Sequence, residues 1–476
     1  MIGTQKRWQE DLFVAGPLSS LIPDDHILKQ VDKVLDLSWL REEVKDLYCI
    51  NNGRPGIDPE AAVRLMLAGF FQGIVHDRKL MREARVNIAI LWFAGFKLGE
   101  KLPDHSSLTK IRQRWGPERF KKIFLKTVQS CIKAGLVNGE TVHVDATLIR
   151  ADVSWESVTT QHAETVINEN ESKDDKPKRL GRPKKQAKPK KRSTTDPDAS
   201  MATSCKKIIA EPCYKQHGAV DDVCGVVVDV EITTGQVSEG SQLPDQVERI
   251  ESNTGRKIDT LSADAGYGNG KNYQYLEQKN IDTIIPPKNP GKRGKGIPLS
   301  EFKYDAKHKI VKCPGNKILT PRTESKLGVT YRAKAKDCDN CRMRSRCFGF
   351  GSASRTVVIV NGYDALLRAR RRHKKPDDKF TRTYSRHRWK VEGMHGEAKT
   401  QHGLSRSIRR GLANMSIQAY LTAAVINLKR LAMYTGGLFA DLLRCFANIL
   451  AVITSTIGLR MFLTNRTRKH NWKMAG

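Results

Sequence analysis

The sequence predicts a multidomain chain of the α+β or α/β class, in which helices accompany a mixed β-sheet. Apolar residues recur at helical spacing over residues 1–138, alternate as in strands within 139–288, and return to helical spacing within 356–434. The length of 476 residues is enough for about two to four structural units. We therefore expect a helical N-terminal domain, a core built on a sheet and a further set of helices.

The charge of the chain predicts a polyanionic partner. Lys and Arg number 83 against 51 Asp and Glu, which gives a formal net charge of +32. The simplest partner of this kind is nucleic acid. A hydrophobic fraction of 39% with 28% charged residues excludes both a chain that is disordered throughout and a multispanning membrane protein.

Two features bear on membranes and on the cellular compartment. The uncharged stretch Cys445 to Leu459, in the tail 435–476, is shorter than the ~20 residues that span a bilayer, so a buried or amphipathic helix is favoured over a membrane or self-association segment. The N-terminus lacks the apolar core of a secretory signal. We therefore expect a cytoplasmic protein without a membrane partner, whose ten cysteines are reduced or bound to metal.

The N-terminal domain, residues 1–138, is predicted to be helical and to bind DNA. Asp58-Pro59-Glu60 has the residue types of a helix start, namely a capping acid, a proline in the first turn and an early acid. Pro103 to Arg114 indicates a turn followed by a short basic helix, a unit that can lie against DNA. A basic helix face is also common in helical domains that bind no DNA, and both interpretations stay open.

The core begins with a strand that carries an acid. The alternation from Thr141 to Thr147 places His143 and Asp145 on the face opposite the apolar residues. An acid in a buried strand is costly unless it is paired or holds a cation. A later strand, from Thr260, ends in Asp264 followed by a glycine turn. The strands within 139–288 predict a sheet with mixed pairing.

A basic segment interrupts this core. Lys176–Arg192 holds ten Lys and Arg residues, three prolines and no acid, and predicts a disordered, solvated linker within residues 165–200. Its Gly-Arg-Pro core resembles an AT-hook, a motif that lies in the minor groove of A·T tracts. Arg182, Lys184 and Lys185 are therefore candidate DNA contacts, either as a nonspecific tether on phosphates or with A·T preference.

A second interruption, residues 289–355, is expected to be a β-rich insertion that contains cysteines. Four thiolates could close around a tetrahedral zinc ion. They are Cys313, Cys338, Cys341 and Cys347. Only Cys338 and Cys341 form a CxxC pair, and Cys313 has no such partner nearby in the sequence, so His308 remains an alternative ligand. Buried reduced thiols without a metal are an alternative interpretation.

The C-terminal helices contain an acid flanked by cations. Tyr384, Arg388, Glu392 and Lys399 follow one another at steps of four, four and seven, which places them on one face of a helix. A carboxylate can hold a divalent metal while neighbouring cations grip a nucleic-acid backbone. The same pattern also fits a surface face that forms salt bridges with itself.

The order Asp145 on a strand, Asp264 after a later strand and Glu392 on a helix resembles the DDE transposases of bacterial insertion sequences. The resemblance covers most of the chain and also includes Pro103 to Ser106 and Thr195 to Ala199. It implies a ribonuclease-H-like core in which the three acids bind two divalent ions, Mg²⁺ or Mn²⁺. Members of the family cut DNA at the ends of a mobile element and join those ends to target DNA.

The resemblance also implies roles for the residues around Glu392. Arg388 and Lys399 match the spacing of the family motif and are expected to contact phosphates. Tyr384 lies one residue further from Arg388 than in the family, so its role is less defined, and Glu397 stays open as another third carboxylate.

The implied partner is double-stranded DNA, namely the terminal repeats of the element and its target, in the nucleoid of a bacterial cytoplasm. A homodimer or larger assembly is expected in the DNA complex, since two ends must be paired. A hydrolytic nuclease on the same fold and a non-catalytic DNA-binding regulator are the alternatives.

Overall fold

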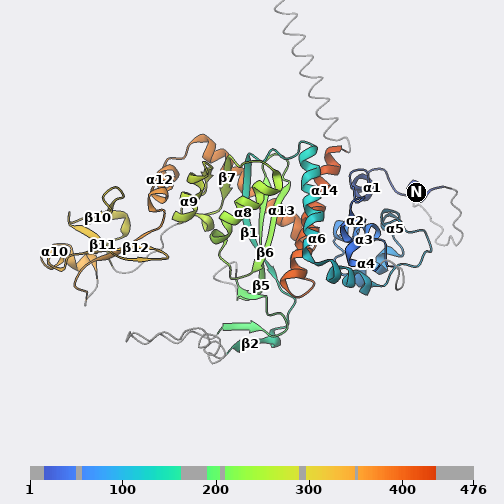
Figure 1. Ribbon diagram of the computed structural model, residues 1–476, viewed down its shortest axis with the longest axis horizontal. Helices are drawn as coiled ribbons and strands as arrows, with labels where there is room; N and C mark the ends of the chain where they lie inside the picture. Colours follow the sequence, from blue (N-terminus) through green and yellow to red (C-terminus); the bar gives the residue numbers. More distant parts are fainter. Residues whose placement is uncertain are drawn as a thin grey trace, which may run out of the picture. The chain divides into compact units, whose positions relative to one another are not determined.

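The computed structural model describes six stretches of the chain (Figure 1). These are residues 16–49, 56–161, 190–203, 210–288, 296–348 and 352–435. Within them the chain forms two compact units. The helical unit comprises the described residues of Met1–Leu136, Thr400–Gly403 and Tyr420–Gly476, and the sheet unit comprises those of Val137–Lys399 and Leu404–Ala419.

The helical unit is built from short helices and two long ones. They are η1 (Leu18–Leu21), α1 (Ile27–Asp32), α2 (Leu40–Val44), η2 (Lys45–Leu47), α3 (Pro59–Phe71), α4 (Asp77–Ala84), α5 (Ile88–Ala94), α6 (His105–Lys133) and the second part of α14 (Leu412–Thr435). The long helices share a core in which Phe124 stacks on Tyr420 with ring centroids 6.2 Å apart. Asn427 donates a hydrogen bond to the Thr127 hydroxyl at 3.2 Å.

Both helix starts expected in this unit are confirmed. The Asp58 side chain caps α3 by accepting from the amides of Glu60 and Ala61. Helix α6 begins directly after Asp104, as the basic segment predicted. Arg112 of that segment is nevertheless buried and donates two hydrogen bonds, at 2.8 and 2.9 Å, to a carboxylate at the start of α4. This arginine therefore joins α4 to α6.

The sheet unit contains a sheet of eight strands. They are β1 (Thr141–Arg150), β2 (Val158–Gln161), β3 (Lys190–Ser193), β4 (Ser200–Ala202), β5 (Glu211–Asp221), β6 (Val227–Thr234), β7 (Thr260–Ala263) and β8 (Asp282–Ile284). Its central strands run in the order β6-β5-β1-β7-β8, in which β5 is antiparallel to β1 and β6, while β7 and β8 are parallel to β1. This is the ribonuclease-H-like arrangement expected from the resemblance, and the predicted mixed sheet is confirmed.

Helices complete the core. They are η3 (Trp155–Ser157), α8 (Glu239–Thr254), η4 (Ala265–Tyr267), α9 (Gly270–Gln278), α12 (Tyr363–Lys374), α13 (Asp378–Thr400) and the first part of α14. Helix α8 packs against β6, and α12 packs against α9 (Figure 1). The apolar side chains of β6 are buried.

Part of the expected basic linker is structured. Residues 190–193 form β3, which pairs with β2, and Ser200 begins β4. Between them, the buried carboxylate of Asp196 accepts from the Tyr214 hydroxyl at 2.6 Å, which ties the segment to β5. The expectation of disorder therefore fails for residues 190–200, because strand pairing and this buried bond fix them.

The insertion forms its own antiparallel sheet, in the order β13-β12-β11-β10-β9. Its elements are η5 (Leu299–Glu301), β9 (Lys303–Asp305), β10 (Ile310–Lys312), β11 (Ile318–Ser325), β12 (Gly328–Ala333), α10 (Ala335–Asp339), α11 (Arg344–Cys347) and β13 (Thr356–Val360). The insertion is β-rich, as predicted, and its last strand extends it to Val360.

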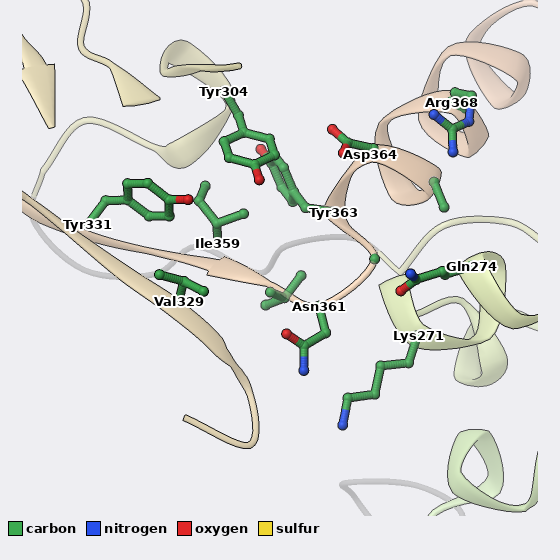
Figure 2. Close-up of a pocket in the computed structure, with 13 residues that line it drawn as sticks. Lys271, Gln274, Tyr304, Val329, Tyr331, Ile359, Asn361, Tyr363, Asp364 and Arg368 are labelled. Atoms are coloured by element: carbon green, nitrogen blue, oxygen red, sulfur yellow. The ribbon is translucent and has the colours of Figure 1, made fainter. Parts of the chain in front are cut away.

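The insertion joins the core around a cavity of about 610 Å³. Figure 2 shows the aromatic rings of Tyr304, Tyr331 and Tyr363 gathered at one side of this cavity, with Lys271 and Asn361 at the other. The Tyr304 ring meets the other two edge to face, at centroid distances of 6.0 and 5.8 Å. Because Tyr331 and Tyr363 are buried, this aromatic cluster is the packing that attaches the insertion to α12.

Candidate active site

Two acids meet where parallel strands β1 and β7 lie side by side. The register pairs Val144 of β1 with Ala263 of β7. Asp145 directly follows the first of these residues, and Asp264 directly follows the second. Burial raises the pKa of Asp145 to about 7, and the negative charges of nearby carboxylates add to this shift. Burial also raises the pKa of Asp264. Such a pair favours a bound proton or a cation.

A further acid, Glu239, lies beside this pair at the start of α8. One carboxylate oxygen forms an ion pair with Lys215 at 3.1 Å. The other approaches Gly266, where a Cβ would lie 2.8 Å from both Glu239 Oε2 and Asp264 Oδ1. A side chain at this position would require at least one of the two carboxylates to move. Sequence reasoning missed Glu239 because acids are common in the first turn of any helix.

A buried hydroxyl also belongs to this neighbourhood. Tyr267 is fully buried, and within the part of the chain that the structure describes its hydroxyl has no hydrogen-bond partner. Burial raises its pKa well above the usual value, and the charges of Asp145, Glu239 and Asp264 raise it further. The hydroxyl therefore stays protonated, as a donor without a partner close to three carboxylates.

Helix α13 covers the polar face of β1. His143 lies 5.6 Å from His387 between ring centroids, and His395 Nε2 lies 3.8 Å from Asp145 Oδ2. Burial lowers the pKa of His395 to about 3, so this ring is neutral. The predicted alternation of His143 and Asp145 on one strand face is confirmed by these contacts, since both meet the same helix.

Lys399 reaches β1 as well. Its ammonium group donates to the Thr147 hydroxyl at 2.6 Å. Burial lowers the pKa of Lys399, and the charge of Asp145 opposes that shift. The close packing depends on Gly218 of β5, which pairs with Asp145, because a Cβ there would lie 3.0 Å from Met394 Cε and 3.5 Å from His395.

The acid and arginine in the middle of α13 are exposed instead. The side chains of Arg388 and Glu392 are 81% and 62% exposed, and the Arg388 Nε donates to both Glu392 oxygens at 3.2 Å. The charge of Glu392 contributes to the raised pKa of Asp145. Tyr384 is partly buried and stacks on His387 at a centroid distance of 5.9 Å. Glu397 is partly buried.

At 100° per residue, the four predicted residues of α13 span an arc of about 80°, with Glu392 at the edge furthest from the buried stripe of the helix. The four residues therefore share one side of the helix, as their spacing predicted, but they differ in how close they lie to the buried stripe. Among the described residues, no three His, Cys, Asp or Glu side chains are grouped closely enough to hold a metal ion. The acids Asp145, Asp264 and Glu239 nevertheless have the donor chemistry that hard divalent cations prefer.

The insertion brings its four cysteines into one neighbourhood. A Cβ on Gly315 would lie 3.7 Å from Cys313 Sγ and 3.5 Å from Cys341 Sγ. Burial raises the pKa of Cys347, and the charges of the other three thiols contribute. The alternative ligand His308 is instead exposed, and its Nδ1 forms a hydrogen bond with Asp305 Oδ2 at 2.7 Å.

Several predictions fall outside the described residues. They concern Arg182, Lys184 and Lys185 of the basic linker, and the tail with Cys445 to Leu459. In the stretches that are described, none of the helices has the length and apolar character needed to cross a membrane.

Comparisons with known proteins identify the family. Residues 17–114 match the family described as "Transposase domain (DUF772)", and residues 144–428 match the "Transposase DDE domain". The second match spans more than half of the chain and includes both strands that carry the paired acids and the helix with Glu392. The chain belongs to the family of DDE transposases, and the resemblance noted in the sequence is confirmed.

Two solved transposase structures are similar to this chain. One is the piggyBac transposase synaptic complex with hairpin DNA, at 10% identity and a TM-score of 0.35, covering 87% of this chain and 75% of that chain. The other is the Mos1 transposase paired-end complex with the left transposon end, at 11% identity and a TM-score of 0.16, covering 52% of this chain and 65% of that chain. No curated protein matches the chain. As a DDE transposase, the protein acts in the transposition of a mobile DNA element.

Proposed function

We propose that the sheet unit cuts DNA strands at the ends of an insertion sequence and joins the freed 3′ ends to target DNA, through metal-dependent hydrolysis and transesterification. Asp145, Asp264 and Glu392 are the proposed catalytic carboxylates. The observation that carries the proposal is the position of Asp145 and Asp264 directly after the paired residues Val144 and Ala263 of two parallel strands, with a raised pKa at each carboxyl. Perturbed carboxyl groups of this kind mark functional sites.

Asp145 and Asp264 are the groups that would hold divalent cations. When bound, two Mg²⁺ or Mn²⁺ ions supply an activated oxygen nucleophile and neutralise the leaving oxygen. The residues fit such ions, because their oxygens are hard ligands and because the buried Tyr267 hydroxyl and His395 ring nitrogens lack protein partners among the described residues. The neutral His395 ring keeps Asp145 from forming an ion pair that would compete with a cation.

Glu392 is the proposed third ligand, and Arg388 its partner before DNA arrives. Because both side chains are exposed, their exchange of partners costs little: an exposed ion pair contributes about 0–1 kcal/mol. Arg388 then contacts a phosphate. Lys399 and Tyr384, whose pKa values respond to the charge of Asp145, contact the DNA strand near this acid. Arg182, Lys184 and Lys185 add phosphate contacts from the basic linker.

The helical unit is proposed to bind the terminal repeats as double-stranded DNA, and a dimer or larger assembly to pair two ends. The basic composition of the chain supports DNA contacts on several domains. A dimer is the smallest assembly in which each of two ends meets its own copy of the carboxylates.

The insertion is proposed to hold one structural zinc ion through Cys313, Cys338, Cys341 and Cys347. Two of these thiols flank Gly315, and the Lys317 amide donates to Cys313 Sγ at 3.3 Å. Amide donors to sulfur stabilise the thiolate form that zinc requires.

The test uses DNA with the sequences that flank the reading frame, incubated with Mg²⁺ or Mn²⁺, and scores cleavage and joining separately. Wild type should cut and join, whereas Asp145→Asn and Glu392→Gln should bind DNA without cutting it. Glu397→Gln, an equal change on the same helix, is the matched control and should keep activity. Loss with Glu397→Gln and retention with Glu392→Gln would assign the third carboxylate to Glu397.

Two outcomes would replace the proposal. Cleavage without joining would favour the hydrolytic nuclease. DNA binding without cleavage in either metal would favour the regulator.

A further inference from the structure

Glu239, at the start of α8, acts on both aspartates of the candidate site. Among the charges that raise the pKa of Asp145, that of Glu239 acts more strongly than that of Glu392. The charge of Glu239 also raises the pKa of Asp264. Because such effects weaken with distance, Glu239 lies close to both aspartates. The structure therefore gathers three carboxylates before the exposed acid of α13 is counted.

The backbone fixes the position of Glu239. The Asn272 side chain donates from Nδ2 to the Gly240 carbonyl at 2.8 Å and to the Tyr267 carbonyl at 2.9 Å. Asn272 is buried, so water does not compete for these bonds. They join the first turn of α8 to the short helix η4, which Asp264 caps. The meeting of the two acids therefore follows from the fold and not from the reach of a flexible side chain.

The carboxylates of Glu239 and Asp264 converge at Gly266. A Cβ on Gly266 would lie 2.8 Å from Glu239 Oε2 and from Asp264 Oδ1, so these oxygens are no further apart than twice that distance. The other oxygen of Glu239 pairs with Lys215 at 3.1 Å. One oxygen of Glu239 thus faces a positive charge of the protein, while the other faces a second acid. Like charges repel each other, and a cation bound to both oxygens reverses that repulsion.

Two buried polar groups face these acids. Tyr267 is 0% exposed, and its hydroxyl has no hydrogen-bond partner among the residues that the structure describes. The charges of Asp145, Glu239 and Asp264 all act on this hydroxyl. The ring nitrogens of His395 also lack partners within the described stretches, and Nε2 lies 3.8 Å from Asp145 Oδ2. Buried polar groups are nearly always paired, so these two indicate a polar ligand between the acids.

We propose that Glu239 is a further ligand of the divalent cation at Asp145 and Asp264, binding through Oε2 while Lys215 holds Oε1. The inference rests on the proposed function, which supplies the cation. The acids of the described chain are spaced too widely to enclose an ion, as expected for carboxylates that repel one another. Glu239 holds the cation before DNA arrives, when Glu392 is still paired with Arg388.

An ion pair with Lys215 is the simpler role for Glu239, and it predicts different behaviour. Lys215 Nζ also donates to the Val237 carbonyl at 2.9 Å, so its position depends only in part on Glu239. If the ion pair is the whole role of Glu239, loss of either partner has the same effect. At a cation site the effects are opposite, because loss of Lys215 removes a competing positive charge.

The test measures the affinity of the full chain for Mn²⁺ without DNA, by electron paramagnetic resonance of the free ion, and needs no turnover. Glu239→Gln should lower the affinity at least about tenfold. Glu239→Asp, which keeps the charge and shortens the reach, should also lower it. Lys215→Met should leave it unchanged or raise it. Glu392→Gln should bind like wild type.

The matched control is Glu248→Gln, the same change at an exposed position further along α8, and it should bind Mn²⁺ like wild type. Circular dichroism and the urea unfolding midpoint, both in EDTA, show that each variant is folded. Wild-type affinity in Glu239→Gln would overturn the proposal, as would an equal loss of affinity in Lys215→Met.

Asp145→Asn, measured alongside, separates this inference from the proposed function. If Asp145→Asn loses Mn²⁺ binding and cleavage while Glu239→Gln keeps both, the aspartates hold the cation and the assignment of Glu239 is wrong. If Asp145→Asn keeps both, the carboxylate site itself is rejected and the inference fails with it.

Discussion

The close contact between β5 and α13 makes Gly218 a sharp test of how the site is positioned. Gly218 pairs with Asp145, and a Cβ at this position would lie 3.0 Å from Met394 Cε and 3.5 Å from His395 Cε1. Alanine therefore requires only a shift of a flexible methyl group of a few tenths of an ångström. We expect Gly218→Ala to change the free energy of unfolding by less than about 1 kcal/mol.

Gly218→Val adds two more methyl groups to the same contact. Overpacking of this kind costs about 1–3 kcal/mol, and the strain is relieved by moving α13 away from the sheet. Helix α13 carries Glu392, His395 and Lys399, so a shift of about 1 Å separates them from Asp145. Misplacement by about that distance can cost about 10²-fold in rate.

The assay follows cleavage of element-end DNA and urea unfolding in parallel. Gly218→Val should cut about 100-fold more slowly and still bind DNA. Met394→Ala in the same chain should restore much of the rate, because it removes the atom closest to the added methyl groups. Full activity of Gly218→Val, or failure of the second change to restore any activity, would refute the view that this packing sets the site.

Three further predictions concern the Lys399 contact, a buried histidine and the cysteines of the insertion. Thr147→Val removes the acceptor of the Lys399 ammonium, so cleavage should fall and the unfolding free energy should drop by about 1–3 kcal/mol, measured by kinetics and urea unfolding. Burial lowers the pKa of His217 to about 4, so the folded protein keeps this ring neutral while the unfolded chain protonates it below about pH 6.5. The protein therefore loses stability as the pH falls through this window. The free energy of unfolding of wild type should fall by about 1.4 kcal/mol relative to that of His217→Gln between about pH 7.5 and 5.5. Zinc analysis should find about one ion per chain, lost in Cys341→Ser and kept in Cys224→Ser; equal zinc in both variants would reject the cluster.

Local features of the fold could be predicted from the sequence. The cap at Asp58 and the alternation around Asp145 depend on neighbours within a few residues, so spacing alone predicted them. The meeting of Asp145 with Asp264 needed only the further rule that parallel strands place their following residues side by side. The sequence supplied both acids at such positions.

Other long-range contacts could not be predicted. Glu239 and Asp264 both approach Gly266, which has no side chain, and no periodicity signals such a meeting between residues of separate elements. Arg112 illustrates the same limit, since its spacing on a basic helix suggested DNA while a buried carboxylate on another helix holds it. Spacing also could not tell which edge of α13 faces the sheet, so the exposure of Glu392 emerged only from packing.

Charge connects the candidate site with the rest of the chain. Carboxylates that raise the pKa of Asp145 also repel the phosphates of a DNA strand, so the site cannot by itself attract its substrate. The excess of 32 positive charges draws DNA to the protein at long range, but this attraction is screened beyond about 10 Å in salt. Only cations within that range of the acids hold a strand against the repulsion. Lys399 on α13 acts on Asp145, and Lys288 acts on Asp264. We expect that a strand held by both cations keeps its phosphate at the carboxylates, where bound divalent cations would convert the repulsion into attraction.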